Sequence, residues 1–432
     1  MTVEDIESRF ARDDSVDVNN IVRRRARALG PAYRLSYDAP IHLVRGEGVY
    51  LYDDLGRAYL DVYNNVPAVG HCHPRVVAAI AEQAATLNAN TRYASELVVD
   101  YAERLLRTFP SELEHVMFTC TGSEAIDLAL RISRFHTRRE GIIVTANAYH
   151  GITTGVAEIS PMIGERVPLG RHVRTIHAPS SGDGAGPVWA AAVSSAIKDL
   201  ERHGIGFGTL VVDTVFSSDG VFTHPAGFLQ DAVGVVHAAG GLVVADEVQA
   251  GFGRTGDMWG FQRHGVVPDL VALGKPMGNG MPIAGVVARA ELLTDFGTAV
   301  KYFNTFAANS VCVAAARAVL DVLADESLLD NATSVGQYLR SGMSRIASAD
   351  RGIGEIRGTG LFIGADIVAP HSDGVPDGPR AQRLMNRLRE RRVLTGITGP
   401  LGNVLKLRPP LPFSRENADV FLSNLDDALA DV

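Results

Sequence analysis

The chain has 432 residues, of which 46% are hydrophobic and 21% are charged, a mixture typical of soluble globular proteins and long enough for two or three domains. Its net charge of −8 gives no general attraction to nucleic acid, and no apolar run reaches the ~18 residues that a membrane span needs. The three cysteines, Cys72, Cys120 and Cys312, lie far apart and predict a reducing cytoplasm without disulfides.

The first 75 residues predict an arm followed by a hairpin. The first 20 residues are acidic and lack an apolar core, so we expect an arm that frays or clasps a partner, not a secretory signal. The basic cluster from Arg23 to Arg27 predicts the solvated face of a helix. Residues 46–62, "GEGVYLYDDLGRAYLDV", alternate around a "DDLG" turn and predict an antiparallel hairpin.

Short apolar runs then alternate with longer amphipathic segments, up to about residue 290. The runs read as strands are "HVMFTC", "GIIVTA", "TLVVDTVF", "GLVVADEV", "LVALGK" and "IAGVVAR". Their apolar character on both faces predicts a buried, mainly parallel sheet covered by helices such as "SEAIDLALRISRFH" and "GFLQDAVGVVHAAG". The predicted fold class is α/β, with a large sheet domain over residues 76–318.

The C-terminal part predicts a smaller α+β domain over residues 319–432, against which residues 1–75 are expected to pack. One long helix is predicted from residue 304 to residue 329, "NTFAANSVCVAAARAVLDVLADESLL". It is followed by strand-like "GEIRGTGLFIGADIV", a helix in "RAQRLMNRLRERRV", a strand in "NVLKLRPPLPF" and a closing helix.

The segment "GFGRTG", residues 251–256, contains the GxGxxG pattern directly after a predicted strand. In a nicotinamide-binding fold the third glycine would open a helix that carries a pyrophosphate on its N-terminus. The residues that follow predict no helix, because Gly260, Gly265 and Pro268 interrupt them, although an acid, Asp269, lies further on. The segment is therefore interpreted as a plain turn. A dinucleotide-binding loop, and with it an NAD-dependent dehydrogenase, stays a remote alternative.

An anion site is better predicted at "TGSEAIDLAL", where a strand runs through Thr121, Gly122 and Ser123 into a helix. Thr121 and Glu124 fit a capping box, and the free amides and dipole of such a helix start favour a phosphate group. An ordinary capped helix is the alternative.

Two charged residues end neighbouring apolar runs. Asp246 follows "GLVVA", where a carboxylate is costly without a cationic partner, and Lys275 ends "DLVALGK" before a proline and glycines. A simple ion pair or an exposed loop lysine would also explain them. Ligands of open α/β sheets bind beyond the carboxyl ends of the strands, so the helix start, Asp246 and Lys275 could converge there. A phosphate cup, an acid and an amine together suit pyridoxal 5'-phosphate.

Beyond these residues, nearly the whole sequence resembles the class III aminotransferase family of pyridoxal-phosphate enzymes, fold type I. The resemblance rests on "TGSEAIDLAL", "AYHG", "DEVQAGFGRTG", "GKPMGNGMP" and "FNTFAANSVCVAAA". It implies that Lys275 forms the Schiff base with the cofactor and that Asp246 pairs with the ring nitrogen. By the same resemblance, "GFGRTG" is a turn behind the cofactor acid.

The resemblance also implies the remaining cofactor contacts and a homodimer with shared active sites, possibly paired into a tetramer. The expected contacts are Tyr149 and Val248 on the two ring faces, Gln249 at the ring oxygen, Gly122 and Ser123 at the phosphate, and Thr305 at the phosphate of the neighbouring subunit's cofactor.

Two departures from the family bear on the reaction. Lys406 stands where many amino-acid transaminases of the family carry an arginine that grips the substrate carboxylate, and Arg408 lies nearby. Asp213 replaces the usual glutamate. Lysine binds phosphate as a point charge, and the ethanolamine-phosphate phospho-lyases resemble this chain most closely in "VGHCHP", "YFNTF", "GLFIG" and "NVLK". A phospho-lyase acting on a phosphorylated amino alcohol is favoured, and an ω-transaminase is the alternative.

Other conspicuous residues are given structural interpretations or left open. His71, Cys72 and His73 have no second ligand pair at zinc spacing, so no metal is predicted. Arg92 could line the substrate mouth or pair with an acid. A non-enzymatic regulator would need a DNA-binding module, and no helix-turn-helix is readable before the hairpin.

Overall fold

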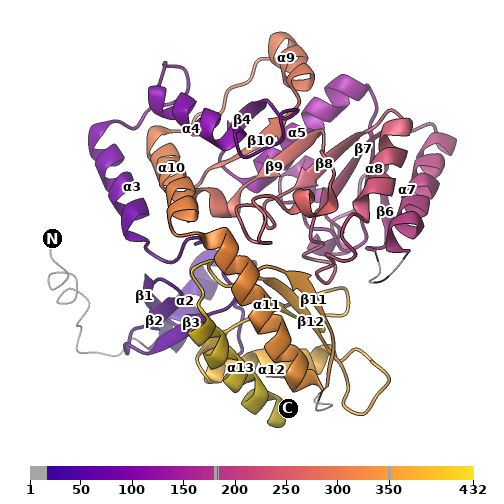
Figure 1. Cartoon of the computed structure of the whole chain (residues 1–432). Coiled ribbons are helices and arrows are strands. Elements are labelled where there is room, and N and C mark those ends of the chain that lie inside the picture. The colour runs from indigo at the N-terminus through magenta and orange to yellow at the C-terminus, as the bar shows by residue number, and fades with distance from the viewer. Residues whose placement is uncertain (1–16, 180–181, 183, 349–351) are drawn as a thin grey trace.

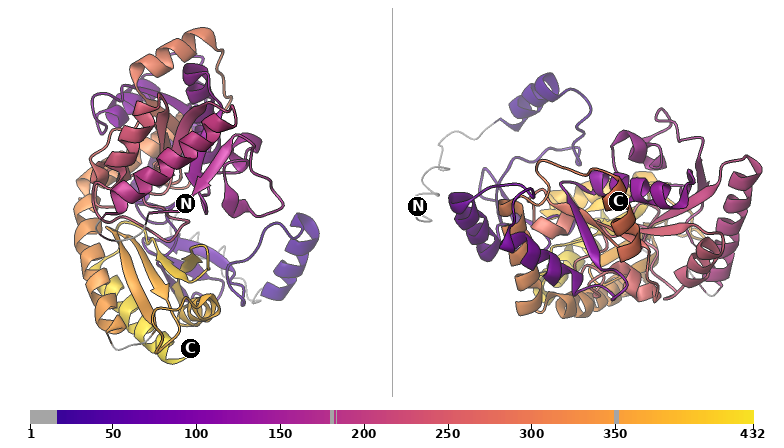
Figure 2. Two further views of the ribbon diagram at one scale, coloured as in Figure 1. Left: turned by 90° about the vertical axis from the view of Figure 1, so that its right-hand side faces the viewer. Right: turned by 90° about the horizontal axis from the view of Figure 1, so that it is seen from above.

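The computed structural model describes residues 17–179, 182, 184–348 and 352–432, and these form two lobes (Figures 1 and 2). One lobe is built around a large sheet, and the other is built from smaller sheets and the C-terminal helices. In the described ranges, no helix combines the length and the apolar character needed to cross a membrane.

The large sheet has seven strands in the order β4-β10-β9-β8-β7-β5-β6. Only β10 runs antiparallel to its neighbours, so the prediction of a mainly parallel sheet is confirmed. Both faces are apolar, because neighbouring residues of one strand enter separate cores, as Ile143 and Val144 do. The strands are β4 (His115–Thr119), β5 (Gly141–Thr145), β6 (Val173–Ile176), β7 (Phe207–Asp213), β8 (Leu242–Asp246), β9 (Leu270–Leu273) and β10 (Ala284–Ala288).

Helices cover this sheet on both faces (Figure 1). Side chains of α5 and α9 pack into one core, and those of α7 and α8 pack into another. From the first lobe the helices are α3 (Pro74–Thr86), α4 (Glu96–Leu106), α5 (Gly122–Thr137), α6 (Thr154–Ala157), α7 (Ala185–Arg202), α8 (Leu229–Ala238), α9 (Ala290–Ala299) and α10 (Ser310–Asp325).

The second lobe contains strands from both the N-terminal and the C-terminal parts of the chain. A four-stranded sheet contains β1 (Leu43–Glu47), β2 (Tyr50–Asp53), β3 (Ala58–Asp61) and β13 (Val393–Leu394), and β13 pairs in parallel with β3. The predicted hairpin is confirmed as β2 and β3. The other four-stranded sheet contains β11 (Ile353–Thr359), β12 (Phe362–Ile367), β15 (Val404–Leu407) and β14 (Gly396–Thr398). Its helices are α11 (Leu328–Ala347), α12 (Gly378–Glu390) and α13 (Arg415–Ala430). The domain limits at residues 75 and 318 stay a prediction.

The single long helix predicted over residues 304–329 is wrong at both ends. Helix α10 begins only at Ser310, because the Asn309 side chain accepts a hydrogen bond from the Cys312 amide and caps it. At the other end Ser327 adopts a left-handed conformation, with φ of 50°, which separates α10 from α11. Apolar periodicity continues across both breaks, so it could not locate them.

The basic cluster near the N-terminus lies on helix α2 (Val18–Leu29), which has no buried residue and stands apart from the two lobes (Figure 2). The predicted solvated helix face is therefore confirmed. Most of the acidic arm, residues 1–16, lies outside the described residues.

Candidate active site

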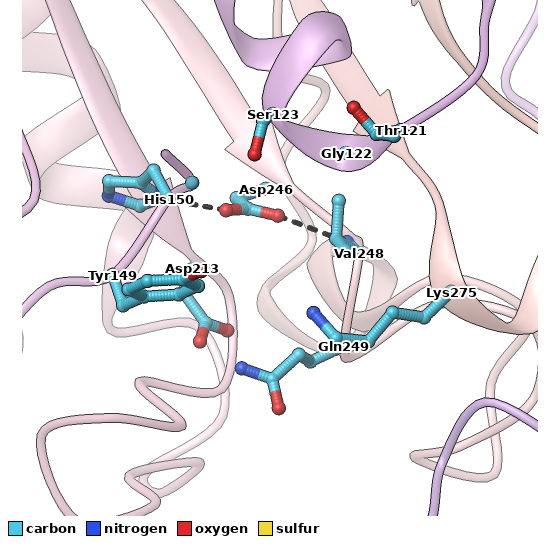
Figure 3. Close-up of a pocket in the computed structure, with 11 residues that line it drawn as sticks. Thr121, Gly122, Ser123, Tyr149, His150, Asp213, Asp246, Val248, Gln249 and Lys275 are labelled. Carbon is cyan, nitrogen blue, oxygen red and sulfur yellow. Dashed lines mark hydrogen bonds and ion pairs between the residues drawn. The ribbon is translucent and has the colours of Figure 1, made fainter. Parts of the chain in front are cut away.

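Polar side chains from five segments of the large sheet meet in one pocket at the carboxyl ends of its strands (Figure 3). They come from the start of α5, the loop after β5, the ends of β7 and β8, and the turn after β9. The lining residues are Thr121, Gly122, Ser123, Tyr149, His150, Gly151, Asp213, Asp246, Val248, Gln249 and Lys275.

The start of α5 presents free backbone amides to this pocket. Thr121 Oγ1 accepts from the Glu124 amide, and Glu124 Oε2 accepts from the Thr121 amide at 2.9 Å, so the predicted capping box is confirmed. The amides of Gly122 and Ser123 lie in the first turn, where a helix offers them no acceptor. Two N–H groups at the positive end of a helix form a site for an anionic group.

Two glycines leave the space that this anion site needs. A Cβ on Gly122 would lie 2.9 Å from Val248 Cγ2, and a Cβ on Gly151 would lie 2.3 Å from Ser123 Oγ. Gly151 also has φ of 145°, which a side chain would strain. The Ser123 hydroxyl accepts from the Ile152 amide at 3.0 Å and so ties the loop after β5 to the helix start.

Asp246 is buried at the end of β8 and is held by two hydrogen bonds. Its Oδ2 lies 2.7 Å from Nδ1 of His150, which is also buried, and its Oδ1 accepts from the Val248 amide at 3.1 Å. A carboxylate only accepts, so His150 carries its proton on Nδ1. These bonds offset the cost of burying the acid and fix its direction.

Lys275 lies just beyond β9, at the start of a short 3-10 turn, Lys275–Gly278. Its side chain reaches toward Asp246 and Gln249 from the side opposite His150 and Tyr149 (Figure 3). Burial lowers the pKa of the Lys275 amine, and the Arg408 cation lowers it further against the opposing effect of Asp246. No ion pair joins Lys275 to Asp246 among the described residues, so the simple ion-pair alternative is wrong. An amine that has a lowered pKa and faces a pocket suits the role of a nucleophile or a base.

The Asp213 side chain, at the end of β7, accepts hydrogen bonds from the loop that follows the strand. Its carboxylate accepts from the amides of Val215 at 3.1 Å and Ser217 at 2.9 Å. Burial, and then the charge of Asp246, raise the pKa of the Asp213 carboxyl. The short side chain is thus occupied by backbone donors rather than by a cation.

The two predicted substrate-binding residues, Lys406 on β15 and Arg408 just after it, reach two different loops, one after β7 and one after β8. Nζ of Lys406 donates to the Ser217 carbonyl at 2.7 Å, and Nη1 of Arg408 donates to Oε1 of Gln249. Both side chains are buried, and burial lowers the pKa of each. Lys406 and Arg408 thus form a basic corner that adjoins the pocket through Gln249.

The "GFGRTG" segment forms turns, and the next element is a short 3-10 turn, Gly260–His264. It opens no α-helix, so the dinucleotide alternative lacks its anion site. Glu247, the second acid before this segment, serves the turn, because it accepts from the amides of Gly260 at 2.8 Å and Phe261 at 2.9 Å. Arg254 donates to the carbonyls of Leu361 and Pro409 in the second lobe.

Other predicted residues lie outside the pocket. Thr305 is exposed, and Arg92 stacks its guanidinium 3.9 Å from the centre of the Phe303 ring. Their predicted roles stay predictions. His71 is bonded to Asp61 at 2.7 Å and His73 to Glu326 at 3.0 Å, and no group of metal-ligand side chains is found in the described ranges.

Sequence reasoning missed His150 and Ser217. His150 stands in the quoted motif "AYHG" in the loop after the buried strand β5, and its position directly after Tyr149 was the available signal. Ser217 gave no signal, because its hydrogen bonds with Lys406 and Gln249 join segments far apart in the sequence.

The geometry can hold a planar ligand with an anionic group and an electrophile. The anionic group would lie on the α5 amides, the ring between Tyr149 and Val248, and the electrophile at Lys275.

Comparison with known proteins gives consistent matches over nearly the whole chain. The family model "Aminotransferase class-III" matches residues 33–429. The chain is 38% identical to "Alanine--glyoxylate aminotransferase 2-like" of Drosophila melanogaster, over 95% of this chain and 87% of that protein. It is 35% identical to "Ethanolamine-phosphate phospho-lyase homolog 1" of Caenorhabditis elegans, over 97% of this chain and 95% of that protein. Among solved structures, a phospholyase from Arthrobacter in complex with phosphoethanolamine is 45% identical, with a TM-score of 0.92, over 95% of this chain and 100% of that chain.

Proposed function

Because this chain belongs to the class III aminotransferase family, we propose that it is the kind of member that eliminates phosphate and ammonia from O-phosphoethanolamine or a similar phosphorylated amino alcohol. The family resemblance and the fold predicted from the sequence are confirmed, and the chain is a pyridoxal-phosphate-dependent enzyme. The observation that carries the proposal is the basic corner of Lys406 and Arg408 beside Ser217 and Gln249, on a chain 45% identical to a phospholyase in complex with phosphoethanolamine.

The pocket fits this cofactor. The α5 amides of Gly122 and Ser123 would hold its phosphate, and Asp246 would hold the ring nitrogen protonated. Tyr149 and Val248 would enclose the ring, and Lys275 would bind the aldehyde covalently. We also propose that Thr305 contributes to the partner's site in a homodimer, that pairing of dimers would give a tetramer, and that the enzyme is cytoplasmic.

When bound, the cofactor accepts electrons from the substrate carbon that bears the amine. The chain's own part is to position that carbon and to move its proton. Nζ of Lys275, whose pKa burial lowers, would remove the proton at this carbon. Asp246, fixed by His150, would keep a negative charge beside the ring nitrogen.

Loss of phosphate from the neighbouring carbon requires a group that holds the leaving oxygens. Lys406 and Arg408 are the basic side chains next to Ser217 and the pocket residue Gln249, and a phosphate dianion would match two cations better than a single carboxylate would. The reaction balances as O-phosphoethanolamine and water giving acetaldehyde, phosphate and ammonia, so no keto acid is consumed.

A transaminase remains the second candidate, because the family and the Drosophila relative support it. The arginine–glutamate switch that would admit two carboxylate substrates is weakened here. Lys406 replaces the arginine, and Asp213 is engaged with the amides of Val215 and Ser217.

Incubation of the holoenzyme with O-phosphoethanolamine and no keto acid tests the proposed reaction. We expect phosphate and ammonia to be released in equal amounts, together with an aldehyde, because elimination needs no amino acceptor. Phosphate and ammonia are measured by colorimetric assays, and the aldehyde by its reduction with a coupled dehydrogenase. Turnover that appears only after pyruvate or another keto acid is added would establish the transaminase instead.

Replacement of Lys406 by methionine is expected to raise the KM for O-phosphoethanolamine by about 10- to 100-fold, the effect of losing one charged hydrogen bond. The methionine keeps most of the side-chain volume in the buried site. Lys198→Met, at an exposed position on α7, is the matched control. Steady-state kinetics with the phosphorylated amine decide the point, and an unchanged KM in Lys406→Met would remove Lys406 from the phosphate site.

A further inference from the structure

The carboxamide of Gln249 lies between two polar groups of very different character. Its Oε1 accepts from Nη1 of Arg408, and its Nε2 donates to Oγ of Ser217 at 2.5 Å. Figure 3 shows its nitrogen turned toward Asp213, inside the pocket, and its oxygen turned away. Both partners come from segments distant in the sequence, so the amide is held from two sides.

Only one of these partners fixes which way the amide faces. A guanidinium only donates, so the atom of Gln249 that faces Arg408 must be the oxygen. A serine hydroxyl both donates and accepts, so Ser217 would accommodate either orientation. The terminal torsion of glutamine is broad and nearly two-fold, and without Arg408 the amide could rotate by half a turn.

We infer that Arg408 is a positioning residue that sets the hydrogen-bonding polarity of Gln249, so that the amide presents an N–H rather than a carbonyl oxygen to the cofactor. With Oε1 on Arg408 and one N–H on Ser217, the second N–H of Gln249 is left for the pocket. The oxygen substituent on the cofactor's pyridine ring would carry negative charge. It would therefore need a hydrogen-bond donor at the position of Gln249. If the amide were rotated, its carbonyl oxygen would face the ring oxygen, and the two lone pairs would repel each other.

The setting of Arg408 supports such a role. Its side chain is 7% exposed and its guanidinium lies 4.4 Å from the centre of the Tyr63 ring, so it is held independently of Gln249. Arg408 thus holds a fixed position from which it can orient the Gln249 amide.

A double-mutant cycle on cofactor binding tests the inference without any substrate. We expect Arg408→Met and Gln249→Leu each to weaken cofactor binding about tenfold, the loss of one hydrogen bond in a polar site. The double variant should also be weakened about tenfold and not about 100-fold, because each change removes the same N–H contact. The equilibrium is followed by dialysis, with the bound cofactor measured by its visible absorbance.

Three further variants make the cycle specific. Arg408→Lys keeps a donor-only group and should bind the cofactor within about threefold of the unaltered enzyme, and so should Ser217→Ala. Arg387→Met, on the exposed face of α12, is the control for loss of an arginine. Thermal melting of each apoenzyme shows whether the variants fold.

Three results would overturn the inference. They are unchanged cofactor binding in Arg408→Met, a multiplicative loss in the double variant, and a larger loss in Ser217→Ala than in Arg408→Met. The multiplicative loss would mean that Arg408 acts through its charge alone. The inference rests on the family's cofactor and on the predicted contact of Gln249, and not on the reaction, so its failure would leave the phospho-lyase proposal standing.

Discussion

Replacing Lys275 with alanine is expected to abolish turnover, with a loss of about 10⁴-fold or more, because the change removes both the covalent anchor and the base. Lys275→Arg should be equally inactive, since a guanidinium keeps the charge but does not lose its proton in proteins. The two variants separate a need for charge from a need for a free amine. Release of phosphate from O-phosphoethanolamine measures turnover in both.

Chemical mapping gives the same prediction an independent readout. Borohydride reduction of the holoenzyme, followed by digestion and mass spectrometry, should place the cofactor mass on the peptide that contains Lys275. The exposed Lys198 on α7 provides the matched substitution, and Lys198→Ala should keep both turnover and labelling. Cofactor mass on any other lysine would contradict the assignment of Lys275.

The pH dependence of this step follows from the environment of Lys275. Burial lowers the pKa of its amine, Asp246 opposes this shift, and the Arg408 cation adds to it. The free amine is the reactive form, so reactivity rises with pH through this lowered pKa and is present at lower pH than for an exposed lysine. Capture of pyridoxal phosphate by the apoenzyme, followed by absorbance, should fall as the pH drops below that range.

Much of the fold was predictable because its signals are local. The strand runs of the large sheet are apolar on both faces, which distinguishes them from half-exposed strands. The start of α5 was predictable for the same reason, since Thr121 and Glu124 are three residues apart and cap one turn. The limits of α10 were not, because the left-handed conformations of Ala308 and Ser327 interrupt a periodicity that itself continues.

The site was predictable only as far as strand ends could place it. Asp246 and Lys275 each follow an apolar run, and parallel topology brings such ends together. The partners that orient the acid and the amide are not local. His150 lies 96 residues from Asp246, and Arg408 lies 159 residues from Gln249. Nothing in the spacing of such residues indicates a contact, so these contacts are known only from the structure.

Changing Asp246 to asparagine is expected to lower kcat by about 10²- to 10³-fold, while the cofactor remains bound. Asparagine has nearly the same shape, but it is neutral, so the positive charge on the ring nitrogen loses its counter-charge and the hydrogen bond with His150 loses its ionic character. Stopped-flow measurement of phosphate release, with cofactor content determined by absorbance, separates loss of chemistry from loss of binding.

The neighbouring acid supplies the matched control for this prediction. Glu247 is as buried as Asp246, but its carboxylate faces the amides of Gly260 and Phe261 and the Thr214 hydroxyl, away from the pocket. Burial raises the pKa of Glu247 to about 7, so this acid is only partly ionised near neutral pH. Glu247→Gln should therefore lower the melting temperature, because its amide would face backbone donors, yet keep kcat per folded enzyme within a few-fold. Equal losses of kcat in the two variants, or near-normal turnover in Asp246→Asn, would show that the charge at residue 246 does not drive the reaction.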